Sequence, residues 1–213
     1  MTVLFFKNVP DYYLNNFKAV RTAFDNLYNL LNVVEAINSS SHCRIDGFEP
    51  DFSFAVFCGD TNRLLVTKKD GYFSMALPFQ VLDEGEIISF NFDYLGEEVS
   101  GRLISIMKNI IYTHTEGCFS HDEVVLSLVD NFSLTVEEAT NYYEGFIYLL
   151  TEDHGYFRFD DDPKNANGVV HPRLHFDFFF KNSTTVKLGI HKTPGINFFY
   201  DIFDSSRKKP FLG

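Results

Sequence analysis

The sequence predicts an α+β fold: an antiparallel sheet with a long N-terminal helix, a central helix pair and a C-terminal β-hairpin followed by a helix. Three observations carry this prediction. Apolar residues recur every three or four positions over 11–37, apolar and polar residues alternate in short runs between 43 and 94 and again between 156 and 180, and two helix-capping sequences follow residue 119. No repeat or linker divides the chain, so we expect a single domain over 1–213, in which 1–40 could form a protruding helical arm.

The helical elements are predicted from periodicity and capping. One continuous helix is expected over 11–37, because a single apolar stripe runs through it; such a stripe usually packs in a core, but it could also pair two copies of the chain. A second helix is expected over 97–113. Two capping boxes, Ser120-His-Asp-Glu123 and Thr135-Val-Glu-Glu138, predict helices over about 121–130 and 136–150. A final amphipathic helix is expected over 196–204.

The strands are predicted from alternation and turn residues. Runs at 52–58, 63–67, 72–77 and 87–94 are rich in aromatic and branched residues, and Lys68-Lys-Asp-Gly71 is a good hairpin turn between the second and third. Two further runs, 156–162 and 171–180, flank a turn centred on Asn165–Gly168. These runs predict an antiparallel sheet or meander.

Composition limits the classes of function. The 213 residues include 45% hydrophobic residues, enough for a sizeable core, and the formal net charge is −11. That charge disfavours a stand-alone nucleic-acid or acidic-membrane binder and suits a protein that docks onto a basic partner. Three widely spaced cysteines without a C-x-x-C motif, no signal peptide and no long apolar run predict reduced thiols, a cytoplasmic location and no membrane span.

The predicted helix pair and following hairpin have the outline of a winged helix. Its second helix carries Glu137, Glu138, Glu144 and Glu152 and no basic residue that could meet phosphate. We therefore expect no sequence-specific DNA binding there, and a packed structural helix pair instead. For the chain as a whole we expect a protein partner.

The C-terminal hairpin concentrates the ionisable residues. Strand parity places Arg158 and Asp160 of the first strand, and His175 and Asp177 of the second, on one face, opposite several phenylalanines. A symmetric register pairs Arg158 with His175, Asp160 with Arg173, Tyr156 with Asp177 and Asp162 with His171.

Three uses of this face are open. His175 could act as acid or base, oriented by Asp177 or Asp160, while Arg158 stabilises developing charge, with Arg173 and His171 binding the substrate; this is the logic of metal-independent RNA cleavage. The same face could hold a divalent metal, although no cofactor is required. It could also be a set of ordinary cross-strand ion pairs.

The segment from Arg158 to Pro163, followed by His171-Pro172-Arg-Leu-His175-Phe-Asp177 and Thr193-Pro194, resembles an uncharacterised bacterial family of unknown function with the pattern R-[FY]-D-x-D-P, then H-P-x-x-H-x-H. Asp177 stands where that pattern has its last histidine. The R-x-D and H-x-H elements are also loosely similar to TumE-like toxins of toxin–antitoxin pairs. Both resemblances imply a bacterial conflict system, either a toxin–antitoxin pair or anti-phage defence. The expected function is an RNase-like site on the hairpin; the alternative is a non-enzymatic interaction or immunity module that binds its partner through an acidic surface.

Overall fold

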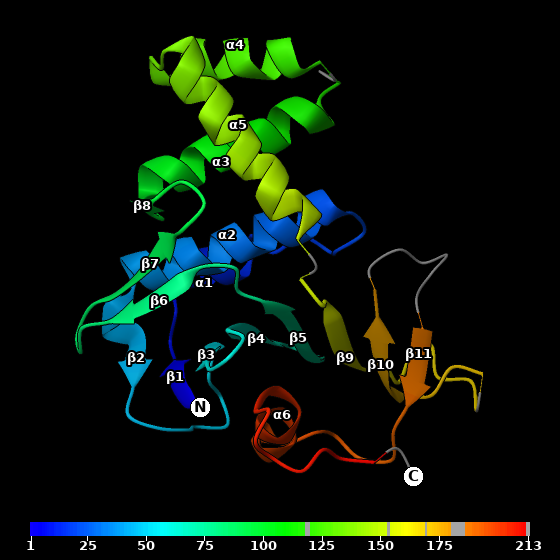
Figure 1. Ribbon diagram of the computed structural model, residues 1–213. Coiled ribbons are helices and arrows are strands. Elements are labelled where there is room, and N and C mark those ends of the chain that lie inside the picture. The colour runs from blue at the N-terminus through cyan, green and yellow to red at the C-terminus, as the bar shows by residue number, and fades with distance from the viewer. Residues whose placement is uncertain (118–119, 153, 169, 180–185, 212–213) are drawn as a thin grey trace. The chain divides into compact units, whose positions relative to one another are not determined.

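The computed structural model describes residues 1–117, 120–152, 154–168, 170–179 and 186–211 (Figure 1). Within these segments the fold is α+β, as predicted, with α-helices and antiparallel strands. Cys118 and Phe180, the last residue of the predicted strand run 171–180, lie outside the described segments. Cys43 and Cys58 are not joined in a disulfide.

The chain forms two compact units. Residues 1–9, 43–77 and 154–213 form a sheet unit, and residues 10–42 and 78–153 form a helical unit. The two segments of the helical unit, 10–42 and 78–153, each begin and end at points of the sheet unit that are joined by a backbone hydrogen bond. The backbone N–H of Lys7 donates to the carbonyl of Cys43 at 2.9 Å, and that of Ala76 donates to the carbonyl of His154 at 2.7 Å.

The sheet unit is built on one eight-stranded antiparallel sheet with the strand order β11-β10-β9-β5-β4-β3-β1-β2. Its strands are β1 (Thr2–Phe6), β2 (Arg44–Ile45), β3 (Phe54–Cys58), β4 (Arg63–Lys68), β5 (Gly71–Ala76), β9 (Phe157–Asp161), β10 (Leu174–Phe178) and β11 (Val186–Gly189). The predicted turn joins β4 to β5, with Lys68 paired to Gly71. The sequence signals did not reveal β1, β2 or β11.

Aromatic side chains fill one face of this sheet. Phe157, Phe159 and Phe176 lie on it, as strand parity predicts. Helix α6 (Ile196–Phe203) lies along the sheet (Figure 1), and its Phe199, which is 1% exposed, packs into the same apolar cluster. Phe176 stacks on Phe198 with ring centroids 5.5 Å apart. Because the apolar side chains of β9 and β10 pack into this layer on one face of the sheet, their polar side chains lie on the opposite face.

The helical unit contains a small antiparallel sheet and the remaining helices. Its strands, in the order β6-β7-β8, are β6 (Gln80–Asp83), β7 (Ile88–Phe92) and β8 (Glu97–Glu98). Its helices are α1 (Asp11–Leu14), α2 (Ala23–Ser39), α3 (Gly101–Thr115), α4 (His121–Phe132) and α5 (Val136–Thr151), and the short 3-10 helix η1 (Ser41–Cys43) spans the boundary to the sheet unit. Both predicted capping boxes are present, at Ser120 and at Thr135. No helix in the described segments is long and apolar enough to cross a membrane.

The prediction of one helix over 11–37 is wrong. Helix α1 ends at Leu14, and α2 begins only at Ala23, after a capping box formed by Thr22 and Asp25. The buried amide of Asn29 satisfies both backbone groups of Lys18 in the intervening loop, each at 2.8 Å. These local hydrogen bonds offset those that a continuous helix would have made. The apolar residues of α2 lie in the core of the unit.

Candidate functional site

The predicted hairpin forms, but its register differs from the symmetric one. In β9 and β10, Asp160 pairs with His175 and Arg158 pairs with Asp177. The predicted pairs are therefore wrong by two residues, because the connection folds around Asp162–Asn165 hydrogen bonds and an Asn167–His171 bridge rather than a turn centred on Asn165–Gly168. A shift of two residues keeps strand parity, so Arg158, Asp160, His175 and Asp177 still share one face.

Two rows of paired residues cross five strands on this face. The first row is Lys68, Gly71, Asp160, His175 and Gly189, and the second is Val66, Phe73, Arg158, Asp177 and Lys187. Positive and negative side chains alternate along Arg158, Asp177 and Lys187 of the second row, and Arg158 lies next to Asp160 of the first, an arrangement that stabilises neighbouring strands. We refer to Lys68, Arg158, Asp160, His175, Asp177 and Lys187 as the hairpin cluster.

His175 is the centre of the cluster and is 2% exposed. Its Nδ1 lies 2.7 Å from the carbonyl oxygen of Pro172. Because a carbonyl can only accept, Nδ1 carries a proton, and Nε2 is the basic nitrogen of the neutral ring. Nε2 faces Oδ2 of Asp177 at 3.7 Å and Oδ2 of Asp160 at 3.8 Å, distances too long for hydrogen bonds.

Cationic side chains neutralise both carboxylates. Arg158 bridges them, with Nε donating to Asp160 Oδ2 at 2.7 Å and Nη2 donating to Asp177 Oδ2 at 2.5 Å. The other oxygen of each carboxylate, Oδ1, is paired with a lysine. Lys68 Nζ lies 2.6 Å from Oδ1 of Asp160, and Lys187 Nζ lies 2.9 Å from Oδ1 of Asp177. Burial alone would raise the pKa of Asp177, but Lys187 and Arg158 outweigh it and hold that pKa below its usual value. Asp177 is therefore ionised at neutral pH despite its burial.

Burial also controls the neighbouring phenol. It raises the pKa of Tyr156, which lies beside Arg158, to about 12. Tyr156 therefore stays protonated at neutral pH and adds no charge to the cluster.

Two glycines of the first row allow close contacts that a side chain would block. At Gly71, which has φ +145°, an added Cβ would lie 2.0 Å from the carbonyl oxygen of Phe159. At Gly189 it would lie 2.7 Å from Cγ of Pro172, the residue whose carbonyl holds the His175 ring. The absence of a side chain at Gly189 thus lets Pro172 approach closely enough to set the ring orientation.

The two predicted substrate-binding residues lie outside the cluster. Arg173 precedes β10, so strand alternation does not govern it; its side chain is 60% exposed and pairs with Asp161, with Nε 2.6 Å from Oδ1. His171 Nε2 lies 3.5 Å from Oδ2 of Asp162, and the His171 ring meets the His175 ring edge-on at 5.0 Å. Sequence reasoning missed Lys68 and Lys187; Lys187 could have been found from the alternation in Val186-Lys-Leu-Gly.

Asp160, His175 and Asp177 each offer one possible metal-ligand atom, and these three atoms lie within 4.8 Å of one another. This donor set suits manganese, iron or zinc, and a metal-binding histidine typically donates its other N–H to a backbone carbonyl, as His175 does. The charges of the hairpin cluster, in contrast, disfavour a divalent metal ion. Three cationic side chains already face two carboxylates, so a divalent ion would enter a cluster of net charge +1, and both Oδ2 atoms accept from Arg158.

The formal charge is divided unequally between the two units. The sheet unit has 14 Lys and Arg against 11 Asp and Glu, a net charge of +3, whereas the helical unit has 4 against 18, a net charge of −14. The overall charge of −11 therefore describes neither unit. The unit that carries the hairpin cluster is mildly basic and compatible with an anionic substrate.

No protein-family model, curated protein or solved structure matches this chain. The resemblances to the bacterial family of unknown function and to TumE-like toxins therefore stay predictions.

Proposed function

We propose that the hairpin cluster is an acid/base site that cleaves a phosphodiester, with RNA as the substrate class, in a bacterial conflict system. The observation that carries the proposal is the fixed His175 ring: Pro172 holds Nδ1, and the basic Nε2 faces a cluster of fixed charges. An oriented imidazole beside carboxylates and a guanidinium is the arrangement that acid/base catalysis requires.

Exposure within the cluster supports the binding of an anion. His175 and Asp177 form a buried floor, with side chains 2% exposed, whereas Arg158, Lys68 and Lys187 are 24%, 35% and 28% exposed. A phosphate would thus meet these three partly exposed cationic groups before the buried floor, with the carboxylate of Asp160, which is 20% exposed, beside them. Fixed cations next to the reacting phosphorus stabilise the extra negative charge of a phosphorane.

The roles follow from these positions. Nε2 of His175 takes the proton of the 2′-hydroxyl as its oxygen attacks phosphorus, and the same ring returns the proton to the 5′-oxygen as that bond breaks. Arg158, Lys68 and Lys187 hold the phosphate. Asp160 and Asp177 stabilise the imidazolium that forms between the two proton transfers.

The test is cleavage of a fluorescent oligoribonucleotide by the full chain in EDTA. We expect cleavage of RNA but not of the same sequence as DNA, and a loss of about a hundredfold or more in His175→Ala. His191→Ala is the matched control, because His191 is exposed and lies outside the cluster. Absence of cleavage by the wild type, or equal rates in the two variants, would overturn the proposal.

The non-enzymatic module is the second candidate, and the net charge of −14 on the helical unit favours it. In that case a basic protein partner binds the acidic unit, and the hairpin cluster only stabilises the sheet. A stable complex that survives His175→Ala but is lost on charge reversal of Glu137 and Glu138 would support this candidate. Loss of that complex on His175→Ala alone would argue against it.

A further inference from the structure

A cavity of about 880 Å³ lies within the sheet unit, where β10 and β11 meet α6 and the segment that follows it. Its wall is formed mainly by aromatic and aliphatic side chains, among them Phe176, Phe178, Leu188, Ile202 and Phe211. We refer to it as the apolar pocket. A volume between about 300 and 1,000 Å³ and a mostly apolar wall are typical of binding sites for small ligands.

Strand pairing builds one wall of the apolar pocket. Phe178 pairs with Val186 and Phe176 pairs with Leu188, so strand alternation places these four side chains together on the face opposite the hairpin cluster. The protein covers this wall only in part, because Phe178 and Leu188 are half-buried and Val186 is 55% exposed. Apolar surface in contact with water is destabilising, and a ligand that covers it would gain the free energy of its burial.

Lys209 holds the other wall against the end of α6. Its Nζ donates to the carbonyl oxygens of Asp201 and Asp204, at 2.9 Å and 2.5 Å, where the helix ends. The last carbonyls of a helix carry partial negative charge and favour such a cation. Phe211 follows two residues later and lines the apolar pocket although it is 87% exposed. The wall is therefore in place before a ligand binds, which lowers the entropic cost of binding.

The ionisable side chains that line the apolar pocket are basic. They are His191 and Lys209, both exposed, and no carboxylate lines it in the part of the chain that the structure describes, although the chain has 29 Asp and Glu. The segment 186–211, which supplies β11, α6 and the residues after it, has five Lys and Arg against two Asp. An anionic group is therefore favoured where the pocket opens to solvent.

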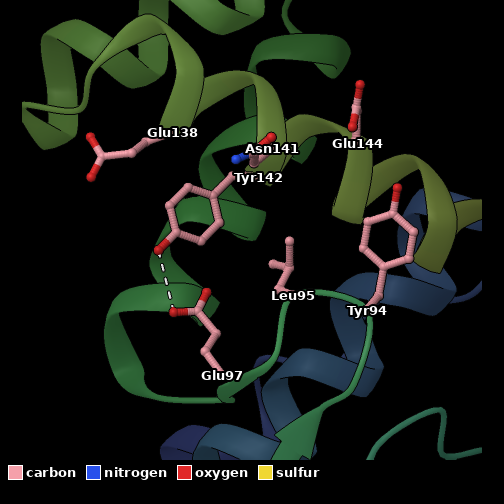
Figure 2. Close-up of a pocket in the computed structure, with 7 residues that line it drawn as sticks. All are labelled: Tyr94, Leu95, Glu97, Glu138, Asn141, Tyr142 and Glu144. Atoms are coloured by element: carbon pink, nitrogen blue, oxygen red, sulfur yellow. Dashed lines mark hydrogen bonds between the residues drawn. The ribbon is translucent and has the colours of Figure 1, made fainter.

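A pocket of about 420 Å³ in the helical unit has the opposite character (Figure 2). Glu97, Glu138 and Glu144 line it, and Glu97 accepts a hydrogen bond from the hydroxyl of Tyr142 at 3.4 Å. Three carboxylates repel an anion, so an anionic ligand with an apolar body fits the apolar pocket and not this one.

We propose that the apolar pocket binds a long-chain fatty acid. The alkyl chain lies between the strand wall and α6, and the carboxylate lies at the opening beside His191 and Lys209. A peptide fits this wall less well, because the backbone N–H and C=O groups that it would bury there need hydrogen-bond partners, which apolar side chains do not supply.

The test is calorimetric titration of the full chain with octanoate, decanoate and dodecanoate, each below the concentration at which it forms micelles. We expect affinity to rise with chain length, by up to about fourfold for each methylene that is buried. In Val186→Asp the affinity for dodecanoate should fall about tenfold or more, because a carboxylate then stands in the strand wall. Val170→Asp is the matched control, since Val170 is 81% exposed, belongs to the same unit and does not line the pocket; it should change affinity by less than about twofold.

Several outcomes would overturn the proposal: no binding of dodecanoate, affinity that does not depend on chain length, equal weakening by the two aspartate variants, or binding of dodecanol or dodecyltrimethylammonium as tightly as dodecanoate. A dimer in sedimentation that Val186→Asp dissociates would also contradict it, because a second copy of the chain would then cover the pocket. Thermal unfolding of each variant reports whether it is folded. Should Val186→Asp fail to fold, Phe211→Ala decides, because Phe211 lines the pocket and is largely exposed. In that variant unchanged affinity would refute the assignment.

Discussion

Replacement of Arg158 by methionine removes the guanidinium that bridges the two carboxylates of the hairpin cluster and keeps much of its side-chain volume. One carboxylate oxygen of Asp160 and one of Asp177 lie within 4.8 Å of each other. At an effective dielectric constant of about 20, two unit charges at that separation repel by about 3.5 kcal/mol. Lys68 and Lys187 offset part of this repulsion, so we expect Arg158→Met to lower the free energy of unfolding by about 3 kcal/mol at pH 7.

The loss of unfolding free energy in Arg158→Met should depend on pH and become smaller in acid. In the wild type the pKa of Asp177 is held below its unfolded value of 3.8, so its stabilising contribution is present above that pH and is lost as pH falls further. In Arg158→Met, repulsion should instead raise the pKa of one carboxyl above its unfolded value, and protonation then relieves the strain. The stability difference between wild type and variant should therefore shrink as the pH falls below about 5.

Urea unfolding between pH 4 and pH 8 measures this difference. Arg173→Met is the control, because Arg173 pairs with Asp161 at the surface with 60% of its side chain exposed, and such a pair contributes about 1 kcal/mol or less. Manganese is the second readout: we expect it to raise the melting temperature of Arg158→Met but not of the wild type. Stabilisation of the wild type by manganese, lost in Asp177→Asn, would refute the charge argument, as would equal deficits in the two arginine variants.

Three further predictions concern positions whose neighbours are fixed. Gly189→Ala should force Pro172 away from the His175 ring and lower stability by about 1–3 kcal/mol in urea unfolding, whereas an unchanged midpoint would mean that the contact relaxes freely. Asn29→Ala should cost about 2 kcal/mol, because both backbone groups of Lys18 lose their partner; a loss no greater than for an exposed residue would contradict this role. Cys43 should react slowly with a thiol reagent at pH 8 in the folded protein and rapidly in urea, since burial raises the pKa of its thiol; equal rates would show that the site opens readily.

Local signals in the sequence predicted most of the helices. The capping boxes at Ser120 and Thr135 mark the starts of α4 and α5, because their hydrogen bonds involve residues only three positions apart. The same signal at Thr22 and Asp25 would have divided 11–37 correctly, but the apolar stripe masked it. A stripe reports which residues are buried and not whether the backbone between them is continuous.

Strand parity predicted which residues share a face of the hairpin, because parity depends only on the extended backbone. It did not predict which residues stand opposite each other, since the register depends on the connection between Asp162 and His171. Lys68 could not be placed from its own neighbourhood at all. It reaches Asp160 only because β5 pairs with β9, a contact between segments far apart in the chain.

The β5–β9 pairing also bears on how the protein folds. Between the two strands lie about 80 residues, and closing an unstructured loop of that length carries an entropic cost before any sheet contact is gained. If 78–153 fold first, the hydrogen bond from Ala76 to His154 joins ends that already lie together, and the cost falls. Substitutions in the helical unit should therefore slow completion of the sheet, and with it the appearance of the hairpin cluster, without touching any of its residues.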